Sequence, residues 1–292
     1  MTGQRNLPGI AALVGAAALF SLMDAGMKLL SPYYPAMQVT ALRSLASLPL
    51  VYVYVLWRGS QARLMQVRWP LHLMRGAIAV LMLWLFVVGL RRLPMTETYS
   101  IFFIAPLLIT ALSAPLLGER VGPARWLAII AGFAGVLVVL RPTGAGMLTW
   151  AGLAILGSAL CYTVSALTIR IAGRTDSTES LMFWLITLLA AGSTMLALSD
   201  WQAVRPQDYW LIAGIGVSGF FGQLGVTYAF QHGEASAVAP FEYTALGWGV
   251  LLDRILWHTT PDRYTLLGAA IIIASGWYLV RREKTHTEAE HP

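Results

Sequence analysis

Residues 70–90 read PLHLMRGAIAVLMLWLFVVGL, and this stretch decides the fold class. After Arg75 it contains no charged residue up to Leu90. An α-helix rises about 1.5 Å per residue, so about 20 residues of this kind cross the ~30 Å hydrocarbon core of a bilayer. The stretch therefore predicts a transmembrane helix.

Similar apolar runs fill the chain on both sides of this stretch. The 292 residues are 57% hydrophobic and 12% charged, whereas a soluble domain is typically about 25% charged. Ten spans are predicted, at residues 8–31, 35–57, 70–90, 94–117, 123–141, 147–171, 179–199, 207–231, 234–257 and 263–281. Long apolar runs argue against a membrane β-barrel, whose strands alternate between apolar and polar residues. The expected fold class is an all-α integral membrane protein with ten transmembrane helices.

The composition and motifs argue against several functional classes. A single cysteine, Cys161, cannot close an intrachain disulfide or form a thiolate metal cage. The sequence has no phosphate-binding loop, no HExxH metal motif and no Ser-His-Asp set, so no enzyme activity, metal or cofactor is expected. Its basic residues lie in short loops rather than in a stripe, which argues against nucleic acid as a partner. The expected partners are the lipid bilayer and a small-molecule substrate.

Lys and Arg residues predict the orientation in the membrane. The side of the membrane that holds both termini carries twelve of them and the opposite side carries seven. Because cytoplasmic loops are enriched in Lys and Arg, both termini are expected in the cytoplasm. The predicted location is the inner (cytoplasmic) membrane.

The two halves of the chain resemble one another. Residues 90–141 align without gaps with residues 230–281 at a constant shift of 140, which places Ala105 on Ala245. The boundaries of the predicted spans coincide in this alignment. The near-constant shift along the chain indicates an internal duplication.

The duplication predicts the domain organisation. The first unit covers residues 8–141, the second covers 148–281, and a polar C-terminal tail follows at 282–292. Each unit has five spans, an odd number, so the second unit must enter the membrane upside down. Inverted repeats of this kind place a binding site near the midplane and permit alternating access by motion of one half against the other.

One segment also carries a family resemblance. The stretch from Leu93-Pro94 through Ala105-Pro106 to Leu117-Gly118-Glu119-Arg120, followed by Gly132 and Gly135, resembles the EamA-type signature of the drug/metabolite transporter superfamily. In the second half, His258-Thr259-Thr260 replaces the Gly-Glu pair. The resemblance implies a ten-helix transporter in which helices 1–4 and 6–9 enclose a central cavity. The chain is most similar to the YddG-type exporters of aromatic and neutral amino acids.

Two charges lie deep within predicted spans, where a charged side chain costs roughly 2.5–3.5 kcal/mol on insertion scales. Glu242 could bind a substrate amine or carry a proton, or it could be the structural partner of a buried donor. Arg43 could bind a substrate carboxylate bidentately, or it could pair with Asp24 or Glu97. Both alternatives remain open for each residue.

Three further charged residues fit structural ion pairs or coupling. Asp24 and Lys28 are spaced i, i+4 on one helix, so they could pair with each other. Lys28 lies near the helix end and could instead snorkel to the interface. Glu97 begins a span, where the helix dipole favours an acid.

Aromatic and amide side chains away from the helix ends are candidates for the lining of a cavity. A cavity with many aromatic rings and few charges suits an amphipathic small molecule, although packing against other helices is the rival explanation for each ring. These candidates, which join Glu242 and Arg43 in the expected substrate site, are Trp84, Tyr99, Tyr162, Gln223, Tyr228 and Tyr243.

The expected function is therefore secondary transport, namely the export of small amphipathic metabolites. Aromatic and neutral amino acids are the first choice. Proton-coupled export of cationic drugs, or of another metabolite, is the alternative. An intramembrane enzyme or a membrane scaffold fits less well, because acids and histidines do not cluster at one depth and a scaffold needs no internal charges.

Overall fold

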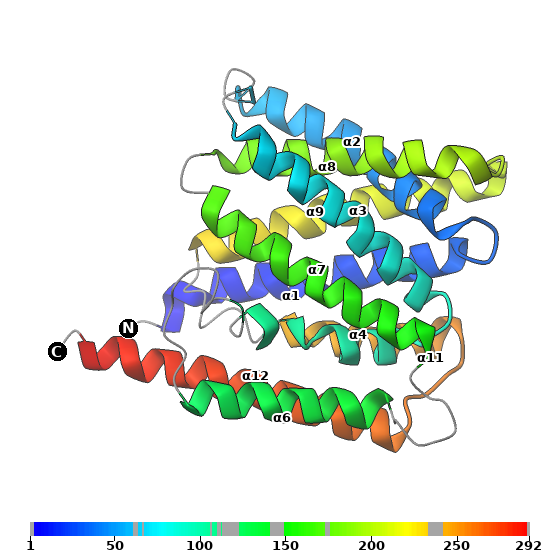
Figure 1. Ribbon diagram of the computed structural model, residues 1–292. Coiled ribbons are helices and arrows are strands. Elements are labelled where there is room, and N and C mark those ends of the chain that lie inside the picture. Colours follow the sequence, from blue (N-terminus) through cyan, green and yellow to red (C-terminus); the bar gives the residue numbers. More distant parts are fainter. Residues whose placement is uncertain are drawn as a thin grey trace.

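The protein is almost entirely helical in the part of the chain that the structure describes (Figure 1). The computed structural model describes residues 3–60, 64–65, 67–105, 107–109, 112, 123–140, 149–172, 176–232 and 242–290. No strand occurs among these residues. The loop motif at 118–120 and the prolines at 106, 115 and 240 lie outside them.

The helices lie on the predicted apolar runs. Their bounds are α1 (Gly3–Leu30), α2 (Ala36–Trp57), α3 (Trp69–Leu90), α4 (Met95–Phe102), α6 (Pro123–Leu140), α7 (Trp150–Ala172), α8 (Thr178–Ala197), α9 (Tyr209–His232), α11 (Thr244–Leu256) and α12 (Arg263–Glu290), with short 3₁₀ helices η2 (Leu198–Asp200) and η3 (Pro206–Asp208). Helix α12 continues past residue 281 into the polar residues that follow.

Six of the described helices are long and apolar enough to cross a bilayer. They lie at residues 11–30, 36–57, 69–90, 150–168, 179–200 and 206–226. Shorter apolar helical stretches occur at Met95–Ile109, Ile129–Val139 and Arg263–Ser275. The chain is thus a multi-pass helical membrane protein.

Helices from the two halves of the chain pack against each other in pairs. Helix α1 packs on α9, α3 on α7, α2 on α8, α6 on α12 and α4 on α11. In Figure 1, α2 and α8 lie along one edge, α6 and α12 lie along the opposite edge, and α4 and α11 lie between α7 and the α6–α12 pair. The start of α1 and the end of α12 lie at the same end of the bundle. Each of these five pairs joins the first half of the chain to the second.

Helix α4 is interrupted, whereas the sequence predicted one continuous span at 94–117. A turn at Phe103 and Ile104 follows α4 before helical residues resume at Ala105. Pro106 comes next in the sequence and has no N–H to donate to the carbonyl of Phe102. This missing donor explains a break at this place in the span.

Helix α11 begins later than its predicted span, which started at residue 234. A 3₁₀ turn at Glu242 and Tyr243 precedes its first residue, Thr244. The residues numbered 140 lower are Phe102, Phe103 and Ile104. The two irregular segments therefore occupy corresponding positions in the two halves.

Helices α6 and α12 approach each other through glycines. A Cβ atom at Gly268 would lie 2.6 Å from the carbonyl oxygen of Gly135, and one at Gly135 would lie 2.9 Å from the carbonyl oxygen of Gly268. Small residues let two membrane helices bring their backbones into contact. A larger side chain at either position would force the two helices apart.

We therefore expect Gly268→Val to destabilise the protein, by about 1–3 kcal/mol, because overpacking of a close contact costs energy of this order. Thermal unfolding of the purified protein in detergent measures the loss. Gly214→Val is the matched control, since a Cβ there meets no atom within 4 Å. Equal melting temperatures for Gly268→Val and the wild type would contradict the close packing of α6 and α12.

Candidate functional site

A buried carboxyl group on α1 is hydrogen-bonded to α4. Asp24 is 7% exposed, and the Tyr99 hydroxyl donates to its Oδ2 atom at 2.8 Å. Tyr99 is itself buried. A buried acid needs such partners, because an unsatisfied polar group away from water is costly. The pair links the middle of the bundle to the interrupted helix.

Arg43 on α2 lies close enough to Asp24 for electrostatic attraction. No acid among the described residues lies within 4.0 Å of its guanidinium, so neither of the ion pairs that the sequence suggested, with Asp24 or Glu97, is formed directly. Its Nε atom donates to the sulfur of Met23 at 3.0 Å. A thioether is a weak acceptor, so this deep guanidinium retains donors for a stronger acceptor.

Aromatic rings from three helical segments line up beside this acid and base. The Tyr99 ring stacks on Phe103 with centroids 6.1 Å apart, and Phe103 meets the edge of Tyr243 at 5.1 Å. Phe102 contacts Tyr162 of α7 at 5.4 Å. These distances fall in the range preferred by interacting aromatic pairs. We call Tyr99, Phe102, Phe103, Tyr162 and Tyr243 the aromatic wall.

Glu242 lies at the other end of the aromatic wall. Its carboxyl group interacts electrostatically with the hydroxyl groups of Tyr162 and Tyr243. Within the described residues, no Lys or Arg lies within ion-pair distance of it. The aromatic wall therefore runs between two carboxyl groups, Asp24 and Glu242.

Side chains at the aromatic wall keep accessible surface although protein surrounds them. Tyr162 is 36% exposed, and Arg43 and Glu242 are half-buried. All three lie deep among neighbouring atoms. Tyr162, Arg43 and Glu242 therefore keep surface that the rest of the protein does not cover.

Three further predicted site residues lie on α3 and α9. Trp84 on α3 is 38% exposed, Tyr228 on α9 is 44% exposed, and Gln223 on α9 is half-buried. The ring contacts that form the aromatic wall include none of these three. The structure thus brings together Asp24, Arg43, Tyr99, Tyr162, Glu242 and Tyr243 from the predicted set.

Lys28 has a different partner from the one that the helical spacing suggested. Its Nζ atom donates to the carbonyl of Leu93 at 2.8 Å, lies 3.7 Å from Asp253 Oδ1 and sits 4.5 Å from the ring centre of Trp257. The structure therefore pairs Lys28 with Asp253 rather than with Asp24. Glu97, in the first turn of α4, attracts Lys28 electrostatically.

Asp253 was missed in the sequence because it stands beside Arg254 near the end of a span, where charges are ordinary. It is only 1% exposed. The start of α4 carries a signal that could have indicated such an acid. Pro94 occupies the N-cap position and supplies no side-chain acceptor, so an acceptor from another helix is required.

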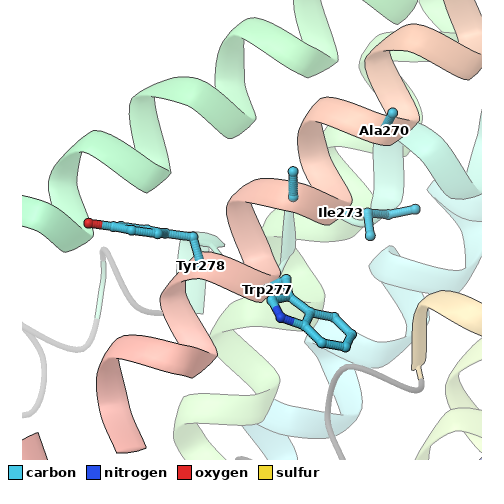
Figure 2. A pocket seen from close by; sticks show the side chains of 5 residues that line it. Ala270, Ile273, Trp277 and Tyr278 are labelled. Atoms are coloured by element: carbon cyan, nitrogen blue, oxygen red, sulfur yellow. The ribbon is translucent and has the colours of Figure 1, made fainter. Parts of the chain in front are cut away.

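A shallow groove also lies on the outer surface of α12. Figure 2 shows the residues that line it, Ala270, Ile273, Ala274, Trp277 and Tyr278, all on one helix. A groove formed by a single apolar helix is not an internal site. Among the described residues, no cluster of His, Cys, Asp or Glu could hold a metal ion.

Known proteins resemble this chain along nearly its whole length. The riboflavin transporter of Vibrio cholerae is 27% identical over 282 residues, which cover 96% of this chain and 92% of that protein. The pseudopaline exporter CntI of Pseudomonas aeruginosa is 26% identical, over 94% and 97% of the two chains. The S-adenosylmethionine uptake transporter of Rickettsia prowazekii is 25% identical, over 93% and 92%.

A solved crystal structure shares the fold. It aligns with a TM-score of 0.64 and covers 97% of this chain and 99% of the other, at 21% sequence identity. The EamA-like transporter family matches the chain twice, at residues 7–141 and 149–281. The names of the relatives point to transport of small molecules rather than to an enzyme. The chain belongs to the EamA-like transporter family, within the drug/metabolite type of transporter.

Proposed function

We propose that this protein is a secondary transporter that exports small amphipathic metabolites, with aromatic and neutral amino acids as its first candidates. One observation carries the proposal. A deep guanidinium, that of Arg43, hydrogen-bonds to a thioether and to no described acid, and it lies near Asp24, whose hydrogen-bond partner Tyr99 belongs to the aromatic wall. A cargo with a carboxylate and an apolar or aromatic body would complement both features.

Each part of such a cargo has a partner at the site. Arg43 binds the carboxylate, since a guanidinium pairs bidentately with carboxylates. The rings of Phe103, Tyr162 and Tyr243, which keep accessible surface, contact the side chain. Asp24, which lies near Arg43, is the acid placed to bind the ammonium group on the same carbon, and Glu242 at the far end of the wall binds a proton. A dianionic cargo would require several cations here, and Arg43 is the cation that the described residues supply near the wall.

Alternating access between two inverted halves is the proposed mechanism. Two matches of one family within the chain support a duplication. The helix pairs support it too: the contact of α1 with α9 corresponds to that of α7 with α3, and α2–α8, α4–α11 and α6–α12 each join a helix to its own counterpart. Phe103 and Tyr243, which differ by 140 in number, touch each other as residues on a pseudo-two-fold axis would.

The relatives support an amphipathic, ring-bearing cargo. Riboflavin and S-adenosylmethionine, which name two of them, both contain a planar heteroaromatic ring. One relative is called an exporter and another an uptake transporter, so the direction of transport is a proposal drawn from the sequence. We place the protein in the inner membrane with both termini cytoplasmic, as its Lys and Arg distribution favours.

Exchange of a cationic cargo for protons is the second candidate function. The observation that favours it is Glu242, a deep acid that lies within ion-pair distance of no described cation. An acid of this kind could bind a cation or a proton in turn.

Counterflow in proteoliposomes tests the proposal. Vesicles that contain the purified protein are loaded with unlabelled phenylalanine and placed in labelled phenylalanine without an ion gradient. We expect labelled phenylalanine to accumulate above the level in unloaded vesicles. Competition by methionine, threonine, riboflavin and S-adenosylmethionine ranks the cargo classes. Absence of counterflow, together with uptake of a labelled cationic dye driven by a pH gradient, would favour the second candidate.

Glu242→Gln tests the role of the acid in proton binding. We expect a pH gradient to have no effect on phenylalanine counterflow by Glu242→Gln, because glutamine cannot bind and release a proton, whereas the wild type should respond to the gradient. Glu179→Gln is the matched control, since Glu179 forms a peripheral ion pair with Arg58 at 3.6 Å. A normal response of Glu242→Gln to the pH gradient would contradict this role of Glu242.

Tyr99→Phe tests the hydrogen bond that supports Asp24. The variant leaves a buried carboxyl group without its tyrosine donor, which costs about 1–3 kcal/mol. We expect a lower melting temperature and a higher half-saturating concentration of phenylalanine. Tyr52→Phe serves as the control, because Tyr52 on α2 is 53% exposed. If the two variants behaved alike, the Tyr99–Asp24 contact would have no role in the site.

A further inference from the structure

The aromatic wall depends on a helix whose own sequence does not supply an N-terminal cap. The N-cap residue of α4 is Pro94, which makes no side-chain cap hydrogen bond. The first N–H groups of any helix need acceptors, and water does not provide them here because Met95 and Thr96 are fully buried. Acceptors for α4 must therefore come from another part of the molecule.

Asp253 of α11 supplies these acceptors. Its Oδ1 atom accepts from the Met95 N–H at 3.0 Å, and its Oδ2 atom accepts from the N–H and the hydroxyl of Thr96 at 2.8 and 2.9 Å. A carboxylate at a helix N-terminus is also favoured by the helix dipole. Lys28 of α1, 3.7 Å away, balances the buried negative charge. Asp253 thus joins α11, α4 and α1 at one point.

The contacts between α4 and α11 continue from this point toward the aromatic wall. At position 249, one helical turn before Asp253, glycine leaves room for the Tyr99 ring, because a Cβ there would lie 2.9 Å from Tyr99 Cδ2. Further along, Phe103 meets Tyr243. The two helices are therefore antiparallel and in a fixed register, with Asp253 at one end and the aromatic pair at the other.

We propose that Asp253 is a positioning residue of the transport site. It touches no cargo, but it fixes the register of α4 against α11 and so holds Tyr99 and Phe103 in place in the aromatic wall. Lys28 contributes to the same set of contacts, because it neutralises Asp253 and donates to the Leu93 carbonyl just before α4. This inference rests on the proposed function for the identity of the site, and its structural part stands by itself.

The first test measures the position of α4 without any cargo. Ser100 on α4 is 1% exposed, so Ser100→Cys in a Cys161→Ala background places a single buried thiol there. Maleimide labelling of this thiol reports how often α4 leaves its place. We expect Asp253→Ala to accelerate labelling at least about tenfold, since it removes three hydrogen bonds to a charged group. Asp253→Asn keeps one acceptor oxygen and should give a smaller increase.

Asp262→Ala is the matched control. Asp262 accepts from the Thr265 N–H at 2.9 Å and so caps α12, a helix that does not carry the wall. This variant should lose stability but leave Ser100→Cys labelling unchanged. Equal labelling rates in the Asp253→Ala, Asp262→Ala and parent proteins would overturn the proposal. If Asp253→Ala does not fold, Asp253→Asn decides the question by the same comparison.

The second test measures phenylalanine counterflow. Asp253→Asn should raise the half-saturating concentration by about threefold or more with little change in the maximal rate, because a displaced wall weakens binding. Asp262→Ala should change neither value. Unchanged half-saturation in Asp253→Asn would contradict a positioning role. If the wild type itself does not transport phenylalanine, the proposed cargo is wrong, and the labelling comparison still decides whether Asp253 positions α4.

Discussion

A lipid bilayer offers no hydrogen-bond partners to a peptide group, and this constraint governs the structure. It explains why the described chain is helical wherever it is apolar. It also explains why interruptions are confined to protected places. The turn after α4 and the 3₁₀ turn before α11 lie against each other inside the bundle, where Phe103 and Tyr243 touch. The start of α4, which Pro94 leaves uncapped, is satisfied by a carboxylate from another helix.

The same constraint shapes the candidate site. Irregular backbone within a membrane protein is tolerated where it is buried in protein or lines a cavity. Both irregular segments here carry residues of the aromatic wall and, at position 242, an acid. Asp24, Arg43 and Glu242 lie along this interior site, whereas the α6–α12 pair meets through small and apolar side chains. The molecule therefore combines a tightly packed pair of helices with a polar and aromatic interior.

Much of this organisation could be predicted from the sequence, and the part that could not has a physical reason. Apolar runs locate helices because the bilayer demands about 20 apolar residues, as at α3. Deep Arg and Glu residues draw attention because their burial is costly, which led to Arg43 and Glu242. Side-chain partners are different. The i, i+4 rule suggested that Lys28 pairs with Asp24, but tertiary packing placed Lys28 beside Asp253, far away in the sequence. Likewise, Trp84 and Tyr99 are both aromatic residues within predicted spans. The packing of α4 on α11, which the sequence does not reveal, sets Tyr99 apart.

The cap on α4 has a consequence for the balance between conformations. In a carrier with two identical inverted halves, the states open to either side of the membrane would be equal in free energy. Position 113, which corresponds to 253 at the shift of 140, is serine in this chain, and serine carries no charge to balance a lysine. The contacts of Asp253 and those at position 113 can stabilise their states by different free energies. Each 1.4 kcal/mol of difference makes one state ten times more populated than the other. Under the alternating-access mechanism proposed above, Asp253 contacts that formed in one state only would make that state the preferred resting orientation.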